Sequence, residues 1–379
     1  MAPSTLSYAE DVRLHYDPEH PAARFGAPAV PPAGGSASGL PHPVPWPSTH
    51  TPKPQPLSPA PAETDSLARF AGYDAIVMTY TSAEAAALAA LFTPGYPVSS
   101  WYEYRYDVAA YIPLVTGSQA PFNSKDPEDQ RYYHSLGLYF PCTIGSAKVL
   151  LVKSGLHLDY DGLGAGGVVP FYKMVTDMVA AVKPKMFITT GTGGGIGSDV
   201  KLGDVIMAAH TRFDCATQFK SQSWAPDTFA TTALPAATLG LITPALTAVN
   251  AKVIATAKPI AGSATPKIWS ANSTIVTTDF FGFDTNINYF KLQGLGQVSD
   301  MGDAMVGRAL QASPSTAWYA IRNASDPQVP MASTSKADYE AADKEAGNIY
   351  RDYGGYTTAA SVIATWAVIV GKTQAAAHH

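Results

Sequence analysis

Charged side chains and cysteine are both scarce in this chain. Only 15% of its 379 residues are Asp, Glu, Lys or Arg, and the formal net charge is −5 at pH 7. A protein that grips a nucleic-acid backbone needs a basic surface, so this composition argues against nucleic acid as a partner. The two cysteines, Cys142 and Cys215, have no CxxC neighbour and are too few for a disulfide framework. No zinc or redox site is therefore expected.

Long apolar runs are absent as well. The most apolar segment late in the chain, residues 361–370, is about half as long as a membrane-spanning helix must be. No basic stretch followed by an apolar run stands at the N-terminus, so we expect no secretory signal. A soluble, cytoplasmic protein without a membrane partner is predicted.

Proline is concentrated at one end of the chain. Fifteen of the 31 prolines fall in the first 61 residues. Proline cannot donate a backbone hydrogen bond or continue a helix, so residues 1–66 are predicted to be an extended or disordered tail. With 46% hydrophobic residues overall, residues 67–373 can form one large catalytic domain, and residues 374–379 resemble a tag remnant.

Short apolar runs bounded by polar or turn residues indicate buried strands. They occur at residues 73–78, 148–152, 186–189, 204–208, 273–276 and 317–321. Helical patterns occupy residues 82–91, 168–182, 303–311 and 338–372, the last interrupted at Gly354 and Gly355. This alternation predicts a layered α/β fold with a mostly parallel sheet. Residues 97–145 and 216–270 do not fit the alternation and are predicted to be insertions, either lids and subunit contacts or surface decoration.

The densest local motif is glycine-rich. Residues 190–197 read TGTGGGIG directly after a predicted strand. Glycines let backbone N–H groups approach a ligand oxygen, and the Thr192 hydroxyl adds a further polar group. No Lys-Ser or Lys-Thr pair closes the motif, which excludes a P-loop, and no helix follows it, as a dinucleotide-binding turn requires. Taken alone, such a turn is as often structural as functional.

Five motifs in a fixed order make this segment more informative. The glycine-rich run is followed by residues 200–206 (VKLGDVI), 275–281 (IVTTDFF), 299–304 (SDMGDA) and 321–326 (IRNASD). The succession resembles the nucleoside phosphorylase and nucleosidase superfamily, and is most similar to the methylthioadenosine/S-adenosylhomocysteine nucleosidases. The resemblance implies a three-layer α/β/α sandwich around a mixed, twisted sheet, a homo-oligomer, and neither a metal nor an organic cofactor.

Two carboxylates are the candidate catalytic groups. Cleavage of an N-glycosidic bond generates an oxocarbenium-like sugar, and an acid that protonates or hydrogen-bonds the base helps it to leave. The resemblance assigns this role to Asp326, acting at N7 of a purine; the alternative is an aspartate that caps a turn before Pro327. Glu84 stands where bacterial nucleosidases place a water-activating glutamate. Residues 81–84 (TSAE) also form a capping box, so both roles of Glu84 stay open.

The resemblance also implies a set of substrate contacts. It consists of Thr192, Gly193, Phe280, Phe281, Met301, Asp303 and Ser325. One of the two phenylalanines would stack on the base while the other packs in the core. Thr192 and Gly193 would face the nucleophile, which is water or phosphate.

The pattern departs from the family at two places. Gly302 replaces the glutamate that binds the ribose hydroxyls, so Asp300 or Asp303 would have to take over, or the sugar is modified or held differently. Thr189 stands where the phosphorylases have a phosphate-binding arginine, although Arg105, Lys125 or Arg131 can reach in from the predicted insertion. The second departure favours water as the nucleophile.

The sequence thus predicts an enzyme, a nucleosidase that hydrolyses a purine-type nucleoside or nucleoside analogue. A nucleoside phosphorylase that uses phosphate is the first alternative. The second is a binding protein that keeps the nucleoside pocket and has lost catalysis.

Overall fold

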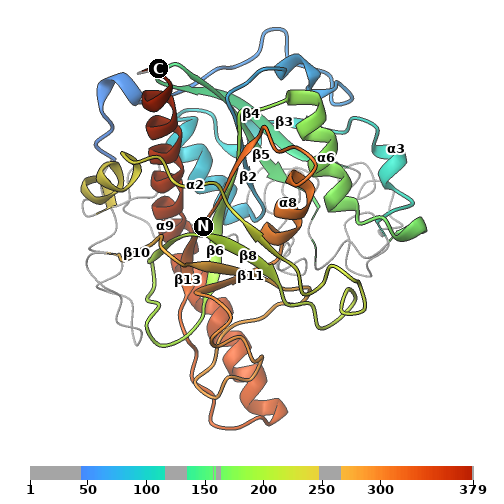
Figure 1. Ribbon diagram of the computed structural model, residues 1–379, viewed down its shortest axis with the longest axis vertical. Coiled ribbons are helices and arrows are strands. Elements are labelled where there is room, and N and C mark those ends of the chain that lie inside the picture. Colours follow the sequence, from blue (N-terminus) through green and yellow to red (C-terminus); the bar gives the residue numbers. More distant parts are fainter. Residues whose placement is uncertain (1–43, 116–134, 157, 159–163, 247–265, 378–379) are drawn as a thin grey trace, which may run out of the picture.

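A mixed sheet with two apolar faces organises the computed structural model, which describes residues 44–115, 135–156, 158, 164–246 and 266–377 (Figure 1). Its centre is formed by β2 (Ala75–Thr79), β5 (Ala147–Ser154) and β6 (Met186–Gly195), with β2 parallel to both neighbours. Side chains alternate between faces along a strand, so Ile76 and Met78 join one buried cluster and Ala75 and Val77 join another. Each face therefore needs a helical layer to cover it.

Two pairs of helices supply these layers. Helices α6 (Pro170–Val182) and α8 (Asp303–Leu310) pack together over the face that carries Ile76 and Met78. Helices α2 (Ser82–Phe92) and α9 (Lys336–Ala377) cover the opposite face, as Figure 1 shows. The predicted three-layer α/β/α sandwich is confirmed.

The remaining strands extend this centre on both sides. They are β1 (Pro52–Pro54), β3 (Tyr102–Tyr104), β4 (Gly137–Ile144), β7 (Val205–Met207), β8 (His210–Phe213), β9 (Thr228–Ala230), β10 (Ile268–Trp269), β11 (Thr274–Thr277), β12 (Val298–Asp300) and β13 (Ala317–Asp326). The main path runs β1-β4-β5-β2-β6-β12-β11-β8-β9, and β13 pairs with both β6 and β7. A short helix, α3 (Val108–Tyr111), follows β3.

The sheet is mixed rather than mostly parallel. Antiparallel pairing joins β4 to β5, β12 to β6 and β13 to β7. The β4–β5 hairpin was missed because β4 lies in residues 97–145, which were predicted to be an insertion. A tight turn with Gly145 at φ +61° makes this hairpin possible, since glycine tolerates a left-handed backbone. The mixed sheet implied by the family resemblance is confirmed, and the parallel sheet inferred from alternation alone was wrong.

Two elements are longer than the sequence predicts. Strand β6 continues through the glycine-rich segment to Gly195, where a loop was expected. Helix α9 runs without a break through Gly354 and Gly355 and extends to Ala377. The Thr358 hydroxyl donates to the Gly354 carbonyl at 2.6 Å, and the ring of Tyr350 packs within contact distance of Gly354. Burial against the sheet thus outweighs the low helix propensity of the two glycines.

The described part of the proline-rich segment lies along the domain. Strand β1 adds to the edge strand β4, a position where proline's missing N–H is tolerated. Trp46 packs against Trp366 of α9 with ring centroids 4.9 Å apart, and the Trp366 indole N–H donates to the His50 carbonyl at 2.8 Å. These contacts attach residues 44–54 to the layer formed by α2 and α9.

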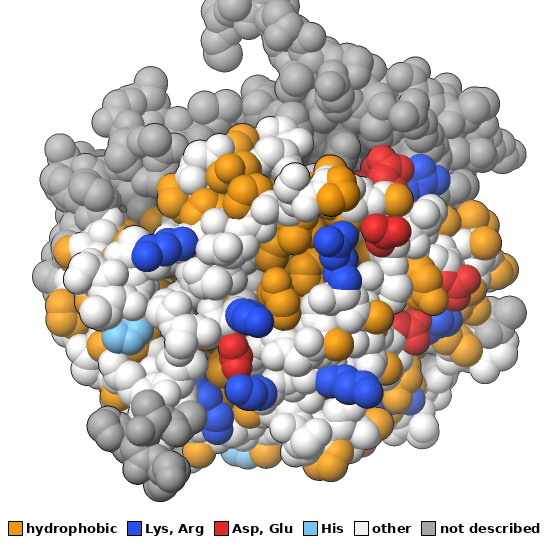
Figure 2. Space-filling view, turned by 90° about the horizontal axis from the view of Figure 1, so that it is seen from above, with side chains coloured by type: hydrophobic (Ala, Val, Ile, Leu, Met, Phe, Trp, Pro, Cys, Tyr) orange, Lys and Arg blue, Asp and Glu red, His pale blue; other side chains and the backbone are white. Residues whose placement is uncertain are grey.

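The surface of the described residues shows no concentrated charge on the face seen from above. Figure 2 shows Lys and Arg side chains spread over this face, several of them beside Asp or Glu. Within the same residues, no helix has both the length and the apolar character needed to span a bilayer.

Replacement of Trp366 tests how much the N-terminal attachment and the α9 layer contribute to stability. Trp366 is 2% exposed, so Trp366→Ala leaves a large cavity and should lower the free energy of unfolding by about 3–5 kcal/mol. Urea denaturation measures the change. Lys336→Ala, at an exposed position of the same helix, should stay within about 0.5 kcal/mol. A similarly small change for Trp366→Ala would contradict this account.

Candidate active site

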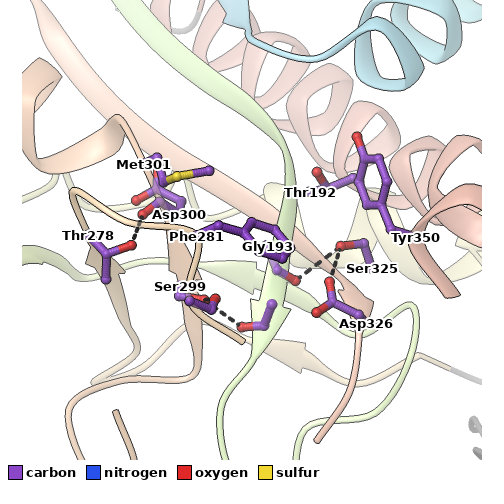
Figure 3. Close-up of a pocket in the computed structure, with 12 residues that line it drawn as sticks. Thr192, Gly193, Thr278, Phe281, Ser299, Asp300, Met301, Ser325, Asp326 and Tyr350 are labelled. Carbon is purple, nitrogen blue, oxygen red and sulfur yellow. Dashed lines mark hydrogen bonds between the residues drawn. The ribbon is translucent and has the colours of Figure 1, made fainter. Parts of the chain in front are cut away.

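A pocket opens beside the carboxyl ends of β6 and β13, next to the antiparallel strand β12. Its lining consists of Thr192, Gly193, Gly194, Thr278, Phe281, Gly282, Ser299, Asp300, Met301, Ser325, Asp326 and Tyr350 (Figure 3). The pocket is narrow, with a volume of about 30 Å³. A small-molecule ligand of nucleoside size therefore requires a lining side chain to turn aside.

Asp326 is the acidic group at one end of the pocket. It is the last residue of β13, and its backbone pairs with Gly194 of β6. The Ser325 hydroxyl donates to Asp326 Oδ1 at 2.8 Å, which orients the carboxyl group. A Cβ on Gly194 would lie only 3.3 Å from Asp326 Oδ2, so glycine at 194 leaves room for this carboxylate. Asp326 is therefore held in the pocket by its neighbours on the strand.

The two phenylalanines of the 275–281 motif have different surroundings. The Phe281 ring lies in the middle of the pocket lining, between Asp300 and Met301 on one side and Asp326 and Tyr350 on the other (Figure 3). Phe280 is not among the lining residues and stacks on Phe290 at a centroid distance of 5.5 Å. Phe281 is thus the aromatic ring placed to contact a ligand.

Glu84 lies behind the pocket and is fully buried. The capping box is formed, with Glu84 Oε2 accepting from the backbone N–H groups of Tyr80 and Thr81 and from the Thr79 hydroxyl. The other oxygen, Oε1, accepts from both the N–H and the hydroxyl of Thr192, at 2.6 and 2.8 Å. The carboxylate thus faces its own helix start with one oxygen and the glycine-rich strand with the other.

The Glu84 carboxylate also explains one of the glycines in that strand. A Cβ on Gly191 would lie 2.2 Å from Glu84 Oε1, which is far inside van der Waals contact. This glycine is required by the close approach of a protein carboxylate. Thr192, which the resemblance placed on the nucleophile side, donates its N–H to Glu84.

A buried arginine holds three carboxylates together. Arg322 of β13 is 1% exposed and makes a bidentate pair with Asp303, through Nε at 2.9 Å and Nη2 at 2.5 Å. The same guanidinium lies 3.2 Å from Asp300 and 3.4 Å from Glu84. Burial alone would lower the pKa of Arg322, but the carboxylates of Asp303, Asp300 and Glu84 raise it well above its usual value. The cluster formed by Arg322, Glu84, Asp300 and Asp303 is hereafter the arginine cluster.

Asp300 is the member of the arginine cluster that lines the pocket. It accepts from the Thr277 hydroxyl at 2.6 Å and from the backbone N–H groups of Gly302 and Asp303. Burial and then the nearby charge of Asp303 raise the pKa of Asp300 to about 7, although Arg322 and the hydrogen bonds act in the opposite direction. Asp300 can therefore exchange a proton near neutral pH.

Tyr80 fills the space beside Gly302. A Cβ at residue 302 would lie 2.8 Å from both Cζ and Oη of Tyr80, so no larger residue fits there without moving the ring. The Tyr80 ring is itself held by the Arg322 guanidinium, which lies 4.8 Å from its centroid. The ring occupies the region that a glutamate side chain at position 302 would otherwise enter.

Six of the predicted site residues meet at this pocket, and three do not line it. Those that line it are Thr192, Gly193, Phe281, Met301, Ser325 and Asp326. Glu84, Asp303 and Phe280 lie outside the lining, the first two in the arginine cluster. Arg105 pairs with Glu63 at 3.4 Å, and Lys125 and Arg131 lie outside the described residues.

The sequence interpretation missed Arg322 and Tyr350. A charged residue inside the apolar run of β13 is a signal for Arg322, because a buried cation requires partners. Tyr350 carries no such signal. It comes from α9, and its hydroxyl lies 2.6 Å from that of Thr81, a residue 269 positions earlier. In the described residues, no group of His, Cys, Asp and Glu has an arrangement that could hold a metal ion.

A family model described as the phosphorylase superfamily matches residues 112–350, more than half of the chain. The match confirms the family resemblance that the five motifs predicted. Glu84 precedes the matched residues. No curated protein matches the chain.

Several solved structures resemble the fold at low identity. A putative 5′-methylthioadenosine/S-adenosylhomocysteine nucleosidase from Francisella philomiragia has 14% identity and a TM-score of 0.46, covering 78% of this chain and 98% of its own. The corresponding nucleosidase from Neisseria meningitidis, in complex with methylthio-immucillin-A, has 15% identity and a TM-score of 0.44, covering 78% and 98%. Futalosine hydrolase from Helicobacter pylori has 13% identity and a TM-score of 0.43, covering 78% and 97%.

The raised pKa of Asp300 predicts how stability depends on pH. Between its ordinary value of 3.8 and about 7, the folded protein holds a proton that the unfolded chain releases. The free energy of unfolding contributed by this group is therefore greatest in acid and falls as pH rises through about 7. Urea denaturation across this range should show a smaller pH dependence for Asp300→Asn, which stays neutral. The control Glu340→Gln, at an exposed position, should keep the wild-type slope, and an unchanged slope in Asp300→Asn would contradict the assignment.

The contact between Gly302 and Tyr80 predicts non-additive substitutions. Gly302→Ala places a methyl group against the Tyr80 ring and should cost about 1–3 kcal/mol of unfolding free energy. In Tyr80→Leu the ring is gone, so adding Gly302→Ala should cost at least about 1 kcal/mol less than in the wild type. Gly347→Ala, where the space is open on α9, should not be destabilising. Strictly additive effects at positions 80 and 302 would show that the ring does not restrict residue 302.

Proposed function

Because this chain belongs to the phosphorylase superfamily, we propose that it breaks the N-glycosidic bond of a purine-type nucleoside or nucleoside analogue by hydrolysis. The pocket beside the carboxyl ends of β6 and β13 and the strand β12 is the reaction site in this proposal. It takes one small molecule and needs no partner macromolecule.

Asp326 acts on the leaving base. Its carboxyl group is oriented by Ser325 and lies in the same pocket as the Phe281 ring. An aromatic ring that stacks on a purine positions the base edge, and an acid at N7 stabilises the electrons that move into the base as the bond breaks. Phe281 must shift within the narrow pocket for the base to enter.

The negative charge around Thr192 favours water over phosphate as the nucleophile. Both donors of Thr192 are directed at Glu84, and the only cation in the arginine cluster is shared among three carboxylates. A phosphate dianion at this end of the pocket would meet excess negative charge and, among the described residues, no available arginine fork. A neutral water molecule meets no such repulsion, so hydrolysis is the reaction this geometry supports best.

Glu84 remains the candidate base for that water, with one added requirement. Its Oε1 accepts from Thr192 and its Oε2 from the start of α2, so a water molecule must replace a present donor. The Thr192 hydroxyl is the donor that can leave most easily, because Thr192 lines the pocket and its side chain can rotate. In this step water donates a proton to Glu84 and attacks the anomeric carbon.

Asp300 is the carboxylate available for a sugar hydroxyl. Asp303, the other replacement considered for the missing glutamate, is buried and bidentate on Arg322. Asp300 lines the pocket, and Tyr80 closes the region beside Gly302. Asp300 already accepts hydrogen bonds from Thr277, Gly302 and Asp303, so it has few lone pairs left for two adjacent hydroxyls, which fits a deoxygenated or modified sugar.

Base release from a nucleoside panel tests the proposal. The panel contains adenosine, inosine, guanosine, methylthioadenosine, the 2′-deoxynucleosides and uridine, each with and without phosphate, and chromatography detects free base and sugar. We expect phosphate-independent release that falls by about 10²–10⁴-fold in Asp326→Asn. Glu340→Gln, which replaces an exposed carboxylate on α9, should retain activity.

The alternatives give different results in the same experiment. A strict requirement for phosphate would identify a phosphorylase. Tight nucleoside binding without release, unchanged in Asp326→Asn, would identify a binding protein. Release at equal rates by the wild type and Asp326→Asn would overturn the assignment of the acid.

A further inference from the structure

A second cavity lies beside the candidate active site. It is polar and roomy, with about 460 Å³ of space accessible to water. Its wall includes Ile196, Trp269, Asn286, Gln293, Gln297 and Gln328. None of these residues belongs to the first pocket, and the proposed reaction does not use them.

The same three chain segments line both cavities. In each segment, one residue lines the first pocket and the residue two positions away lines the second cavity. The pairs are Gly194 and Ile196, Ser299 and Gln297, and Asp326 and Gln328. The Ile196 N–H donates to the Gln297 carbonyl at 2.7 Å, so the pairing of β6 with β12 continues past the strand ends. Residues two apart in extended chain face the same way, roughly 6–7 Å apart. The second cavity therefore follows the first at its Asp326 end.

A buried carboxylate orients two of the amides. Asp284 is 2% exposed and accepts from Gln328 Nε2 at 2.9 Å and Gln293 Nε2 at 3.1 Å, and from the Gly197 N–H at 2.7 Å. A carboxylate accepts hydrogen bonds only, so the NH₂ end of each glutamine must point to it. The carbonyl oxygens of Gln293 and Gln328 are left as acceptors.

Two other amides are held in the opposite sense. Gln297 Oε1 accepts from the Thr274 N–H at 2.7 Å, and Asn286 Oδ1 accepts from the Met331 N–H at 2.6 Å. A backbone N–H can only donate, so the NH₂ ends of both side chains are left as donors. The cavity thus combines two acceptors and two donors, each with its orientation set by a protein partner.

The charge of the wall excludes an anionic group as the preferred occupant. Among the residues that line the cavity there is no Lys or Arg, and Asp199 is the charged member. The Trp269 indole N–H donates to Asp204, and one face of its ring is covered by the Lys267 ammonium, 3.1 Å from the centroid. Oriented amides beside an aromatic surface suit an uncharged group that both donates and accepts hydrogen bonds.

We propose that this cavity is a subsite for an uncharged, hydroxyl- or amide-bearing arm on the base of the substrate. The proposal rests on the proposed function, because it takes Asp326 to contact N7 of a purine. The substituent at position 6 shares an edge with N7. An arm on the exocyclic amine therefore begins beside Asp326 and can run along the chain toward Gln328 and Gln297. The substrate class is a purine nucleoside with a polar, neutral substituent at position 6.

Binding to the full chain carrying Asp326→Asn, which is expected to slow turnover, tests this subsite. Isothermal titration calorimetry compares adenosine derivatives with a hydroxybutyl or a pentyl group on the exocyclic amine, two arms of equal length. We expect the hydroxybutyl derivative to bind about tenfold more tightly than the pentyl derivative, because its hydroxyl can form one or two additional hydrogen bonds. Adding Gln328→Met or Gln297→Met should reduce this preference to less than about threefold. Gln311→Met, at an exposed position at the end of α8, should preserve it.

Each outcome decides between the two proposals. Equal affinity for both arms in the parent chain would overturn the subsite while leaving the nucleoside site intact. A preference that survives both Gln328→Met and Gln297→Met would place the arm elsewhere and overturn it as well. No binding of either derivative or of adenosine would overturn the proposed function together with the subsite.

Discussion

The guanidinium of Arg322 is the group on which the arrangement of the site depends. Arg322 is a residue of β13, and its buried guanidinium binds carboxylates from α2, β12 and α8. Helices α2 and α8 cover opposite faces of the sheet, so one side chain links both helical layers to the strand that carries Asp326. Charges removed from water are stabilised only when they are paired and hydrogen-bonded, which makes each member of the arginine cluster depend on the others.

This charge arrangement sets the character of the pocket. Three carboxylates share one cation behind the glycine-rich strand, and Glu84 uses both donors that Thr192 offers. The end of the pocket near Thr192 is therefore unfavourable for anions. The Asp326 end is also unsuited to anions, since it leads to a cavity lined by amide groups that Asp284, Thr274 and Met331 orient. A ligand that spans both ends has to be neutral and rich in hydrogen-bonding groups at its base.

Several elements could be predicted because their signals are local. The apolar runs at β2, β5 and β13 appear in the sequence as buried strands, and the capping box at Thr81 marks the start of α2. Strand β4 was missed because its aromatic residues lie in a segment without helix and strand alternation, and its pairing with β5 is what defines it. The glycines of α9 were misread for a related reason. Their low helix propensity is a local property of the sequence, whereas the packing of α9 against the sheet, which compensates for it, is not.

By itself, the sequence determined the layered α/β class, the family, and the order of the motifs that supply Asp326, Phe281 and Met301. The class follows from the alternation of apolar and helical patterns, and the family from a resemblance carried by short motifs. Only the tertiary structure decided that Glu84 faces Thr192, that Tyr80 closes the space beside Gly302, and that Tyr350 lines the pocket. Glu84 and Thr192 are 108 positions apart in the chain. Tyr350 is 269 positions from Thr81, whose hydroxyl it contacts. The geometry of these contacts depends on how strands and helices pack, and no local pattern in the sequence encodes the distance between two side chains on different layers.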